Sequence, residues 1–336
     1  MATYYDINGQ KVQNLVSDPS PVTEGQVWYN TVSDTAKVQS ITTSAAWSTG
    51  GALPVAIGGL GFNAGTQNSM TIMGGYNPAI SNYSTITNTY DGTSWAVASP
   101  YNLPGRASIG SAGTSTAGLA IGGYAVGGAT PLDACNWDGT SWTTNPASIN
   151  VFFEGGGSFG TDTAAIICSG GPIVGNTRTE SYNGTAWTTV NPTLSPSSGG
   201  SSSGTQTAGM WCGGNRNYPG TISVTSTADW DGTSWVSSGA MGTPKGFMAS
   251  TKGSPATDVL IFGGNQRPGG LLSQTEAYDG SVWATGTSQP TASEAQRGAG
   301  TSSAATITGG YAPGATVNTF EYTGVGVAKT KTITTS

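Results

Sequence analysis

Apolar residues along the chain come in short runs rather than at helical spacing. The most apolar segments, such as residues 117–121 and Val259–Phe262, are four or five residues long, and each ends at a Gly-Gly pair. Short apolar runs bounded by turn residues are typical of strands that are buried on both faces. Other segments, such as residues 107–112, are rich in Gly, Ala and Ser, whose small side chains suit a crowded centre. The pattern therefore predicts a succession of short strands.

These strands belong to an internal repeat with three markers in a fixed order. A Tyr/Trp–Asp/Asn–Gly–Thr/Ser–x–Trp motif occurs five times and ends at Trp95, Trp142, Trp187, Trp235 and Trp283. Trp47 precedes the series, and successive tryptophans lie 45 to 48 residues apart. Gly-Gly pairs occur at 74–75, 122–123, 170–171, 213–214, 263–264 and 309–310, and a Gly-Thr or Gly-Ser turn lies nine or ten residues before each. This self-similarity is the signature of a repeat architecture.

Each copy is predicted to contain four strands, which we call a, b, c and d in chain order. The Asp-Gly or Asn-Gly pair predicts a tight hairpin turn of the primed kind between c and d, with strand d beginning at the second aromatic. A four-stranded unit of this length, with a Gly-Gly pair after its second strand and aromatics on its last two, resembles a kelch repeat. The resemblance implies an all-β, kelch-like β-propeller.

Six blades are expected, because six Gly-Gly pairs are present. Trp47 would then lie on a strand d supplied from the N-terminal side, beside residues 319–322. Seven blades are the alternative, because residues 1–50 are about one repeat long and residues 328–335 could form a further strand d.

Composition and charge narrow the possible functions. Charged residues make up 8% of the chain, against a usual level of about 25%, which argues against a helix-rich or a disordered protein. The net charge is −6 and no basic run occurs, so nucleic acid is not an expected partner. No apolar stretch is long enough to span a membrane as a helix, and residues 1–15 lack the apolar region of a signal peptide.

The residue types needed for most catalytic and metal sites are scarce. The chain has no histidine, which removes most metal sites and most general bases that work at neutral pH. Cys135, Cys168 and Cys212 lie in apolar segments and are expected to be buried free thiols. The five arginines are spread over five repeats, and Arg106 and Arg297 fall at positions that the repeat suggests are equivalent. We therefore expect no enzyme, no cofactor and no metal.

The b–c loops are the expected binding region. In a propeller the b–c and d–a connections share one face, and the b–c loops vary in sequence while the other turns are nearly uniform. These loops carry aromatic, amide and guanidinium groups, which suit stacking and hydrogen bonding with a sugar or a protein. The candidate binding residues are Tyr76, Asn77, Tyr124, Asn215, Arg216, Tyr218, Asn265, Arg267 and Tyr311.

The first 48 residues depart from the repeat and are expected to form a segment that docks the protein or completes the ring, with the propeller over residues 49–336. Two hairpins are predicted, one within residues 4–12 and one joining residues 24–31 to residues 37–39. The stretch Gly-Gln-Val-Trp-Tyr-Asn-Thr at 25–31, followed by Lys37-Val38, resembles a segment common in virion proteins of tailed bacteriophages. The serial repeats and the ending at residues 322–334 are similar to kelch-like structural proteins of phages that infect cyanobacteria and other aquatic bacteria.

That resemblance implies a virion structural protein: a tail, fibre, neck or head-decorating component assembled in the bacterial cytoplasm. The implied partners are other virion proteins and a host cell-surface glycan or protein, with several copies in each particle. A glycan-binding, lectin-like adhesin is the alternative, and a propeller glycosidase is the third possibility. The resemblance brings no catalytic residues.

Overall fold

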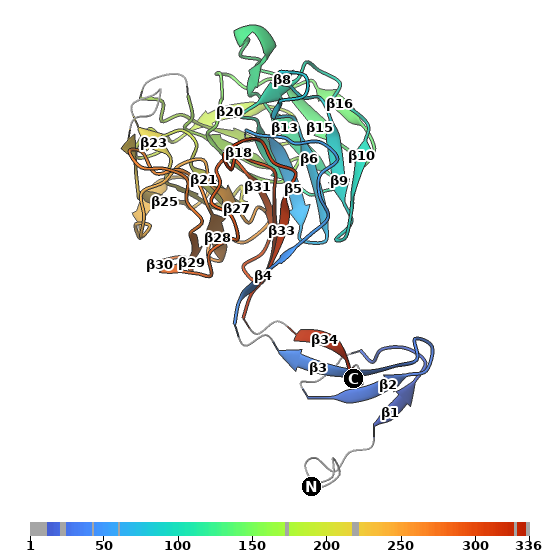
Figure 1. Cartoon of the computed structure of the whole chain (residues 1–336). Coiled ribbons are helices and arrows are strands. Elements are labelled where there is room, and N and C mark those ends of the chain that lie inside the picture. Colours follow the sequence, from blue (N-terminus) through green and yellow to red (C-terminus); the bar gives the residue numbers. More distant parts are fainter. Residues whose placement is uncertain are drawn as a thin grey trace. The chain divides into compact units, whose positions relative to one another are not determined.

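The computed structural model describes residues 12–20, 25–41, 44–59, 61–171, 175–216, 222–325 and 328–333 (Figure 1). Strands make up nearly all of the regular structure, and the helical part of the described chain is one short 3-10 turn, η1 (Val126–Gly128). None of the described helical structure has the length and apolar character needed to cross a membrane. The chain forms two compact units, one of Met1–Ala46 with Thr323–Ser336 and one of Trp47–Tyr322. The all-β prediction is confirmed.

The unit Trp47–Tyr322 contains six four-stranded sheets, which we number in chain order. Sheet 1 contains β5 (Phe62–Thr66), β6 (Ser69–Met73), β9 (Thr87–Tyr90) and β10 (Trp95–Ala98). Sheet 2 contains β12 (Gly110–Gly113), β13 (Gly118–Ile121), β15 (Ala134–Trp137) and β16 (Trp142–Asn145). Sheet 3 contains β17 (Gly157–Gly160), β18 (Ala165–Cys168), β19 (Thr179–Tyr182) and β20 (Trp187–Val190).

The second half of this unit repeats the pattern. Sheet 4 contains β21 (Ser201–Thr205), β22 (Ala208–Cys212), β25 (Thr227–Trp230) and β26 (Trp235–Ser238). Sheet 5 contains β27 (Ala249–Ser250), β28 (Val259–Phe262), β29 (Thr275–Tyr278) and β30 (Trp283–Thr285). Sheet 6 contains β31 (Arg297–Gly300), β32 (Ala304–Thr308), β33 (Thr319–Thr323) and β4 (Ala46–Thr49). Two short hairpins in b–c loops pair β7 (Tyr76–Asn77) with β8 (Asn82–Tyr83) and β23 (Asn215–Arg216) with β24 (Ile222–Ser223). A further two-stranded sheet pairs β11 (Arg106–Ala107), which precedes β12, with β14 (Tyr124–Ala125), which follows β13.

The outer strand of sheet 6 comes from the other end of the chain, as predicted. Strand β4 lies beside β33, and the N–H of Gly50 donates to the carbonyl of Thr319 at 2.9 Å. The ring of Trp47 packs edge-on against Phe262 of sheet 5 and Tyr322 of sheet 6, with centroid distances of 5.3 and 5.1 Å. The first residues of this unit therefore hold its last sheet in place.

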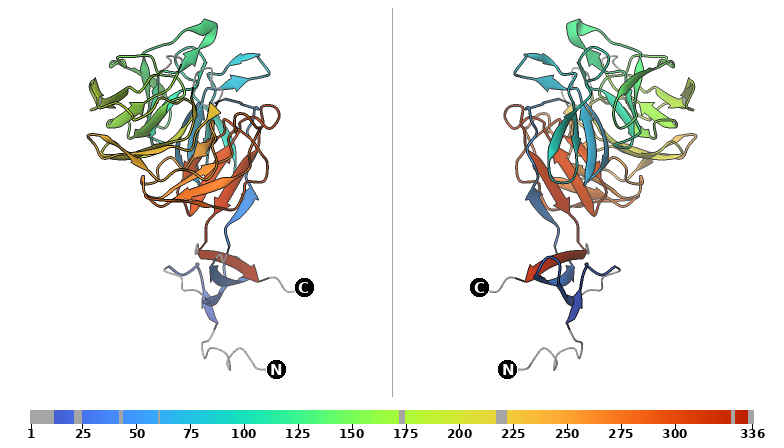
Figure 2. Two further views of the ribbon diagram at one scale, coloured as in Figure 1. Left: turned by 90° about the vertical axis from the view of Figure 1, so that its left-hand side faces the viewer. Right: turned by 90° about the vertical axis from the view of Figure 1, so that its right-hand side faces the viewer.

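The six sheets are arranged about their first strands. These inner strands contact one another in the cyclic order β5, β12, β17, β21, β27, β31 and back to β5. Figure 2 shows the sheets of this unit from two further sides. Apolar clusters fill the space between neighbouring sheets, as where Phe62 and Met73 of sheet 1 pack with Trp137 and Trp142 of sheet 2. The three cysteines are free and buried, as predicted. The architecture is an all-β, propeller-like fold.

The c–d turn differs from the predicted primed hairpin. Tyr90 pairs directly with Trp95, so four residues form the loop, and of Asp91 and Gly92 only the glycine has a positive φ, 91°. A type I′ turn needs positive φ at both residues. Instead, Oδ1 of Asp91 accepts hydrogen bonds from the backbone N–H groups of the third and fourth loop residues at 2.8 and 2.7 Å. These bonds hold the pKa of the Asp91 carboxyl below its ordinary value. The prediction failed because the side chain, rather than the backbone, closes this turn.

Both chain ends contribute to one small sheet in the other unit. Its order is β1 (Gln13–Leu15), β2 (Val27–Asn30), β3 (Thr35–Ile41) and β34 (Ala328–Ile333). The predicted hairpin joining residues 24–31 to 37–39 is present as β2 and β3, whereas residues 4–11 of the other predicted hairpin lie outside the described residues. Strand β34 pairs with β3, so it does not extend the series of propeller sheets, as the seven-blade alternative required.

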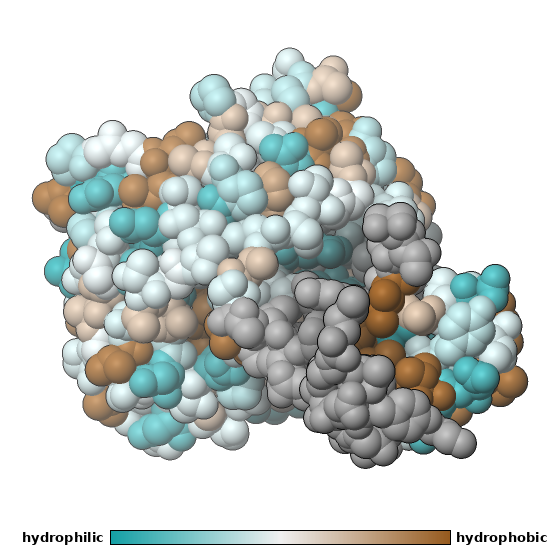
Figure 3. Space-filling model, turned by 60° about the horizontal axis from the view of Figure 1, so that its bottom comes forward, coloured by the Kyte–Doolittle hydropathy of each residue, from teal (hydrophilic) through white to brown (hydrophobic). Residues whose placement is uncertain are grey.

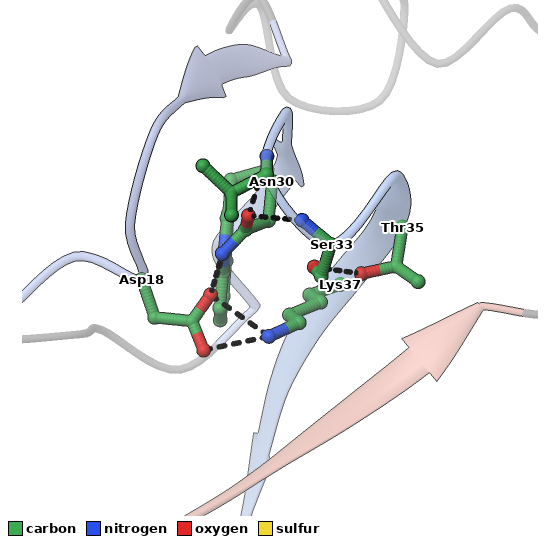
Figure 4. A network of polar contacts seen from close by, with 7 residues as sticks. Asp18, Asn30, Ser33, Thr35 and Lys37 are labelled. Atoms are coloured by element: carbon green, nitrogen blue, oxygen red, sulfur yellow. Dashed lines mark hydrogen bonds and ion pairs between the residues drawn. The ribbon is translucent and has the colours of Figure 1, made fainter.

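One carboxylate joins the strands of this small sheet (Figure 4). Asp18 accepts hydrogen bonds from Trp28 Nε1 at 3.0 Å and Asn30 Nδ2 at 2.8 Å, and it forms an ion pair with Lys37 at 2.7 Å. The bond with Lys37, followed by those with Asn30 and Trp28, lowers the pKa of Asp18 to about 2. Because Trp28 is fully buried, Asp18 fixes the indole that forms the centre of this sheet.

Candidate functional site

One position of the repeat, just before each inner strand, has left-handed backbone in all six copies. The φ angles lie between 54° and 77° at Gly59, Ser108, Gly155, Gly199, Phe247 and Ala295, which we call the left-handed series. Backbone hydrogen bonds link neighbouring members: Gly155 N–H to Ser108 O at 3.0 Å, Gly199 N–H to Gly155 O at 2.6 Å, Phe247 N–H to Gly199 O, and Ala295 N–H to Phe247 O at 2.7 Å. In the described part of the chain, these links run from Ser108 to Ala295 and do not include Gly59.

A cavity of about 160 Å³ lies where that chain of hydrogen bonds is interrupted. Its lining includes Gly59, Ser108, Phe247, Arg267, Glu294 and Tyr311. Loop residues from the repeats of four different sheets (1, 2, 5 and 6) thus meet at one point on the b–c side. We call this space the loop-face cavity.

Phe247 is the most unusual residue of the cavity wall. Left-handed φ in a bulky residue is an uncommon and strained conformation, and three of its five counterparts are glycine. Its ring lies against the backbone of Gly199, where an added Cβ would come within 2.8 Å of the ring. The guanidinium carbon of Arg267 lies 5.0 Å from the ring centroid, within the range of a cation–π contact. The strain at Phe247 therefore places an aromatic face and a guanidinium group together at the cavity.

Glu294 and Tyr311 form the opposite part of the wall. Their backbones pair, with Tyr311 N–H donating to Glu294 O at 2.9 Å and Glu294 N–H to Tyr311 O at 3.1 Å. Oε2 of Glu294 is buried and has no hydrogen-bond partner among the described residues. Burial raises the pKa of Tyr311, and the nearby Tyr76 and Tyr83 raise it further. The cavity wall thus includes a glutamate with one buried oxygen that has no hydrogen-bond partner among the described residues, and a phenol that stays protonated at neutral pH.

Five of the nine predicted binding residues occupy one repeat position on this face. Each follows a Gly-Gly pair and forms a backbone bridge to the residue that immediately precedes one member of the left-handed series. The bridged pairs are Gly58 with Tyr76, Ala107 with Tyr124, Ser198 with Asn215, Gly246 with Asn265, and Glu294 with Tyr311. The structure therefore brings these predicted residues together around the same face.

The tyrosines form a connected aromatic cluster over sheets 1 and 2. The rings of Tyr76 and Tyr83 meet edge-to-face with centroids 6.4 Å apart, and those of Tyr83 and Tyr124 with centroids 5.9 Å apart. Tyr311 packs directly over the backbone of Gly58, leaving no room for a Cβ there. Edge-to-face contacts orient rings while leaving their other faces to a ligand.

A serine that the sequence did not single out contacts two of these five residues, Asn215 and Asn265, and one further candidate, Arg267. Oγ of Ser223 accepts from the N–H of Arg267 at 2.8 Å and donates to Asn215 Oδ1 at 2.8 Å, and the carbonyl oxygen of Asn265 lies 3.2 Å away. Asn215 is therefore buried for a structural purpose rather than presented to solvent.

The remaining candidates are not gathered at the cavity. Asn77 is buried, and its Oδ1 accepts from the N–H of Ala79 at 2.9 Å, which shapes its own loop. Arg216 is exposed on the separate β23–β24 hairpin. Tyr218 lies outside the described residues.

The buried acids of the c strands have structural partners. Glu180 accepts from the backbone N–H groups of Asn150 and Val151 at 2.8 and 3.0 Å. Glu276, at the same repeat position, accepts from the N–H of Gly242 and forms an ion pair of 2.9 Å with Lys245. Among the residues that the structure describes, no three Cys, Asp or Glu side chains converge as a metal site would require.

Comparison with known proteins identifies the architecture only. The chain matches no protein-family model and no curated protein. Among solved structures it is similar to YjhT, with a TM-score of 0.66 over 81% of this chain and 96% of YjhT. The sequence identity is 13%, so the likeness concerns the fold alone.

Sequence reasoning missed Phe247, Glu294 and Ser108, which line the cavity from the d–a connections. A signal was present: when the repeats are aligned on their inner strands, Phe247 occupies a position that is glycine in three copies. A large aromatic at a glycine position indicates a local requirement that overrides backbone preference.

Proposed function

We propose that this chain is a virion structural protein of a tailed bacteriophage that acts by non-covalent contacts. In this proposal Trp47–Tyr322 is a six-bladed kelch-like propeller, and the small sheet made by the chain ends attaches it to the particle. The protein carries out no chemistry, works in several copies per particle, and contacts other virion proteins.

The six-blade count is supported by three observations. Six four-stranded sheets follow one another in Trp47–Tyr322, their inner strands contact in cyclic order, and β4 supplies the outer strand of the last sheet. Joining the first and last segments of a ring in one sheet is a physical means of closing it, because opening the ring then requires breaking that sheet.

The virion role rests on one observation: the segment that resembles phage virion proteins forms its own compact unit. Residues 25–31 and Lys37-Val38 lie on or beside β2 and β3, and β34 pairs with β3 to complete the sheet. A separate module built from both chain ends can bind a neighbour without altering the repeat fold. On the face shown in Figure 3, residues of intermediate and low hydropathy predominate and apolar residues occur in small groups among them, which suits a particle component exposed to solvent.

The test is incorporation into particles. Particles produced with the full-length protein should contain it after salt washing and gradient purification, as detected by quantitative mass spectrometry. A variant in which Trp28 is replaced by alanine should leave the propeller folded but fail to incorporate. A protein that is abundant in the lysate yet absent from washed particles would contradict the proposal.

A lectin-like function is the second candidate, and the loop-face cavity favours it. Proteins bind sugars with the kinds of group that line this cavity. These are aromatic faces, one guanidinium, one carboxylate oxygen without a hydrogen-bond partner and a protonated tyrosine. Glycan-array binding by the full-length protein that is lost in Glu294→Gln would support this function. A response shared equally by wild type and variant would argue against this cavity as the site.

A further inference from the structure

The inner strands surround a channel that is lined by a ring of small polar residues. The second residue of each inner strand occupies the same position: Asn63, Ser111, Ser158, Ser202, Ser250 and Gly298. Hydrogen bonds join neighbours around the ring, such as Asn63 Nδ2 to Gly298 O at 2.6 Å and Ser158 N–H to Ser202 Oγ at 2.9 Å. The centre of the propeller-like unit is therefore polar, while its apolar contacts lie between the sheets.

One turn breaks the repeat at this channel. In five sheets the b-strand partner of the ring residue comes nine positions later, as for Ser111 and Ala120, whereas in sheet 5 Ile261 comes eleven positions after Ser250. The additional residues allow Lys252 to leave the strand pattern. Its side chain crosses the channel toward sheets 2 and 3.

The Lys252 ammonium is bound only by uncharged oxygens. Nζ donates to Ser158 O at 2.9 Å, to Ser158 Oγ at 3.0 Å and to Ser111 Oγ at 3.1 Å, and Ser111 O lies at 3.4 Å. In the described chain, no Asp or Glu forms an ion pair with it. The ionisable side chain on the six inner strands is that of Arg297, and the Cys168 thiol acts electrostatically on Lys252. The channel thus holds a cation without a counter-charge.

Two small cavities flank this amine. They have volumes of about 40 and 30 Å³, and Lys252, Asn63 and Ser111 line both of them. A polar cavity of this size can hold a water molecule or an ion of similar size. Oγ of Ser158 accepts from both Lys252 and Ser111 N–H, and within the described residues its own proton is given to no acceptor. An ion in the larger cavity, which Ser158 also lines, would find an ammonium and a hydroxyl donor beside it.

We propose that the channel binds a small monovalent anion of halide size against Lys252 and Ser158. The occupant is an anion because the site has a positive charge, a spare hydroxyl proton and no acid among its lining residues, and it is small because the cavity admits little more than one water-sized group. This site is distinct from the loop-face cavity and does not depend on the virion role. The ion would tie sheets 2, 3 and 5 together through the lysine.

Binding must weaken as the lysine loses its proton. Desolvation lowers the pKa of Lys252 to about 7, with the Cys168 thiol acting in the opposite direction. A bound anion favours the protonated amine, so affinity should fall roughly tenfold for each pH unit above neutrality.

The probe is sodium bromide, which is titrated into the full-length protein. Sodium fluoride keeps the ionic strength constant, because fluoride is smaller and more strongly hydrated than bromide and should compete poorly for the site. At pH 6 the unfolding midpoint should rise with bromide and saturate, and the apparent affinity should fall at least tenfold at pH 8.5. Lys252→Met should abolish the saturable part, and Ser158→Ala should weaken it. Crystals grown with bromide should show one anomalous peak beside Lys252 Nζ.

The matched control is Lys37→Met, which removes a cation of the other compact unit and should keep the bromide response. A bromide effect that is equal in wild type and Lys252→Met would overturn the proposal, as would water alone in the channel at pH 6. If Lys252→Met proves unstable, Ser158→Ala and the anomalous peak decide the question, and a peak elsewhere would equally count against the site.

Discussion

The indole N–H of Trp142 donates a 2.8 Å hydrogen bond to Oγ1 of Thr87, the first residue of the c strand in the preceding sheet. Three other copies repeat this contact: Trp95 with Thr319 at 2.9 Å, Trp235 with Thr179 at 3.0 Å, and Trp283 with Thr227 at 3.0 Å. The Trp95 bond joins sheet 1 to sheet 6, so the same contact spans the point where the two ends of the repeat meet. The conspicuous tryptophan of the repeat is thus a link between sheets.

Replacing Thr87 with valine should destabilise the protein by about 1–3 kcal/mol, because a buried indole N–H would lose its acceptor while the cavity stays filled. Equilibrium denaturation in urea measures this change. Thr143→Val, on an exposed position of β16, is the matched control and should stay within about 0.5 kcal/mol of wild type. Equal effects at both positions would remove the inter-sheet bond as an explanation.

Sheet 3 lacks this bond, and its absence can be repaired. The residue equivalent to Thr87 is Ala134, and the buried Nε1 of Trp187 has no partner among the described residues. Ala134→Thr should supply the missing acceptor and raise the free energy of unfolding by about 1 kcal/mol. Ala134→Val adds similar volume without the hydroxyl and should give no gain. A valine variant as stable as the threonine variant would show that filling space, rather than hydrogen bonding, is responsible.

The repeat could be predicted because its markers are local. The aromatic pair, the Gly-Gly pair and the spacing of the tryptophans all lie within single copies, and Trp47 could be assigned to the last sheet from its distance to Trp95 alone. The pairing of β34 with β3 could not be foreseen, since neither strand carries a repeat marker that specifies its partner.

The arginines show where the repeat alone misleads. Arg106 and Arg297 look equivalent in sequence, but the left-handed residues Ser108 and Ala295 fix the register and place Arg106 two residues before and Arg297 two residues after this position. Arg106 accordingly forms an ion pair with Asp133, whereas Arg297 donates to the carbonyl of Gly74 at 2.7 Å.

The face that carries the candidate site could be predicted from the sequence, because the loops there vary. The cavity could not, because it depends on single side chains such as Phe247.

Phe247→Gly should separate stability from recognition. Glycine removes the cost of left-handed backbone in a bulky residue but also removes the contacts with Arg267 and Gly199, so we expect the free energy of unfolding to change by less than about 1 kcal/mol. Binding of any loop-face ligand, measured by glycan array or by adsorption to host cells, should fall at least tenfold. Unchanged binding would exclude Phe247 from the site.

The small sheet should lose stability in acid through Asp18. Its pKa is lowered to about 2 in the folded protein, so its contribution is present above the ordinary value near 4 and is lost as the pH falls from about 4 to about 2. The ¹⁹F resonance of 5-fluorotryptophan at position 28 reports this sheet directly. Asp18→Asn keeps an acceptor for Asn30 Nδ2 and Trp28 Nε1 but removes the charge. It should therefore flatten the pH dependence of the resonance, as should Lys37→Met. A wild-type resonance that is constant from pH 5 to pH 2 would contradict this role.

The most direct test of the whole account is a reconstruction, by electron cryo-microscopy, of the purified virus particles that the proposed function expects to contain this chain. The account predicts a toroidal density of six four-stranded sheets, repeated by the particle symmetry, with the small sheet of β1, β2, β3 and β34 in contact with a neighbouring virion protein and the loop-face cavity turned to solvent. Particles without this density, or density in which the loop face is buried and the small sheet contacts nothing, would contradict it.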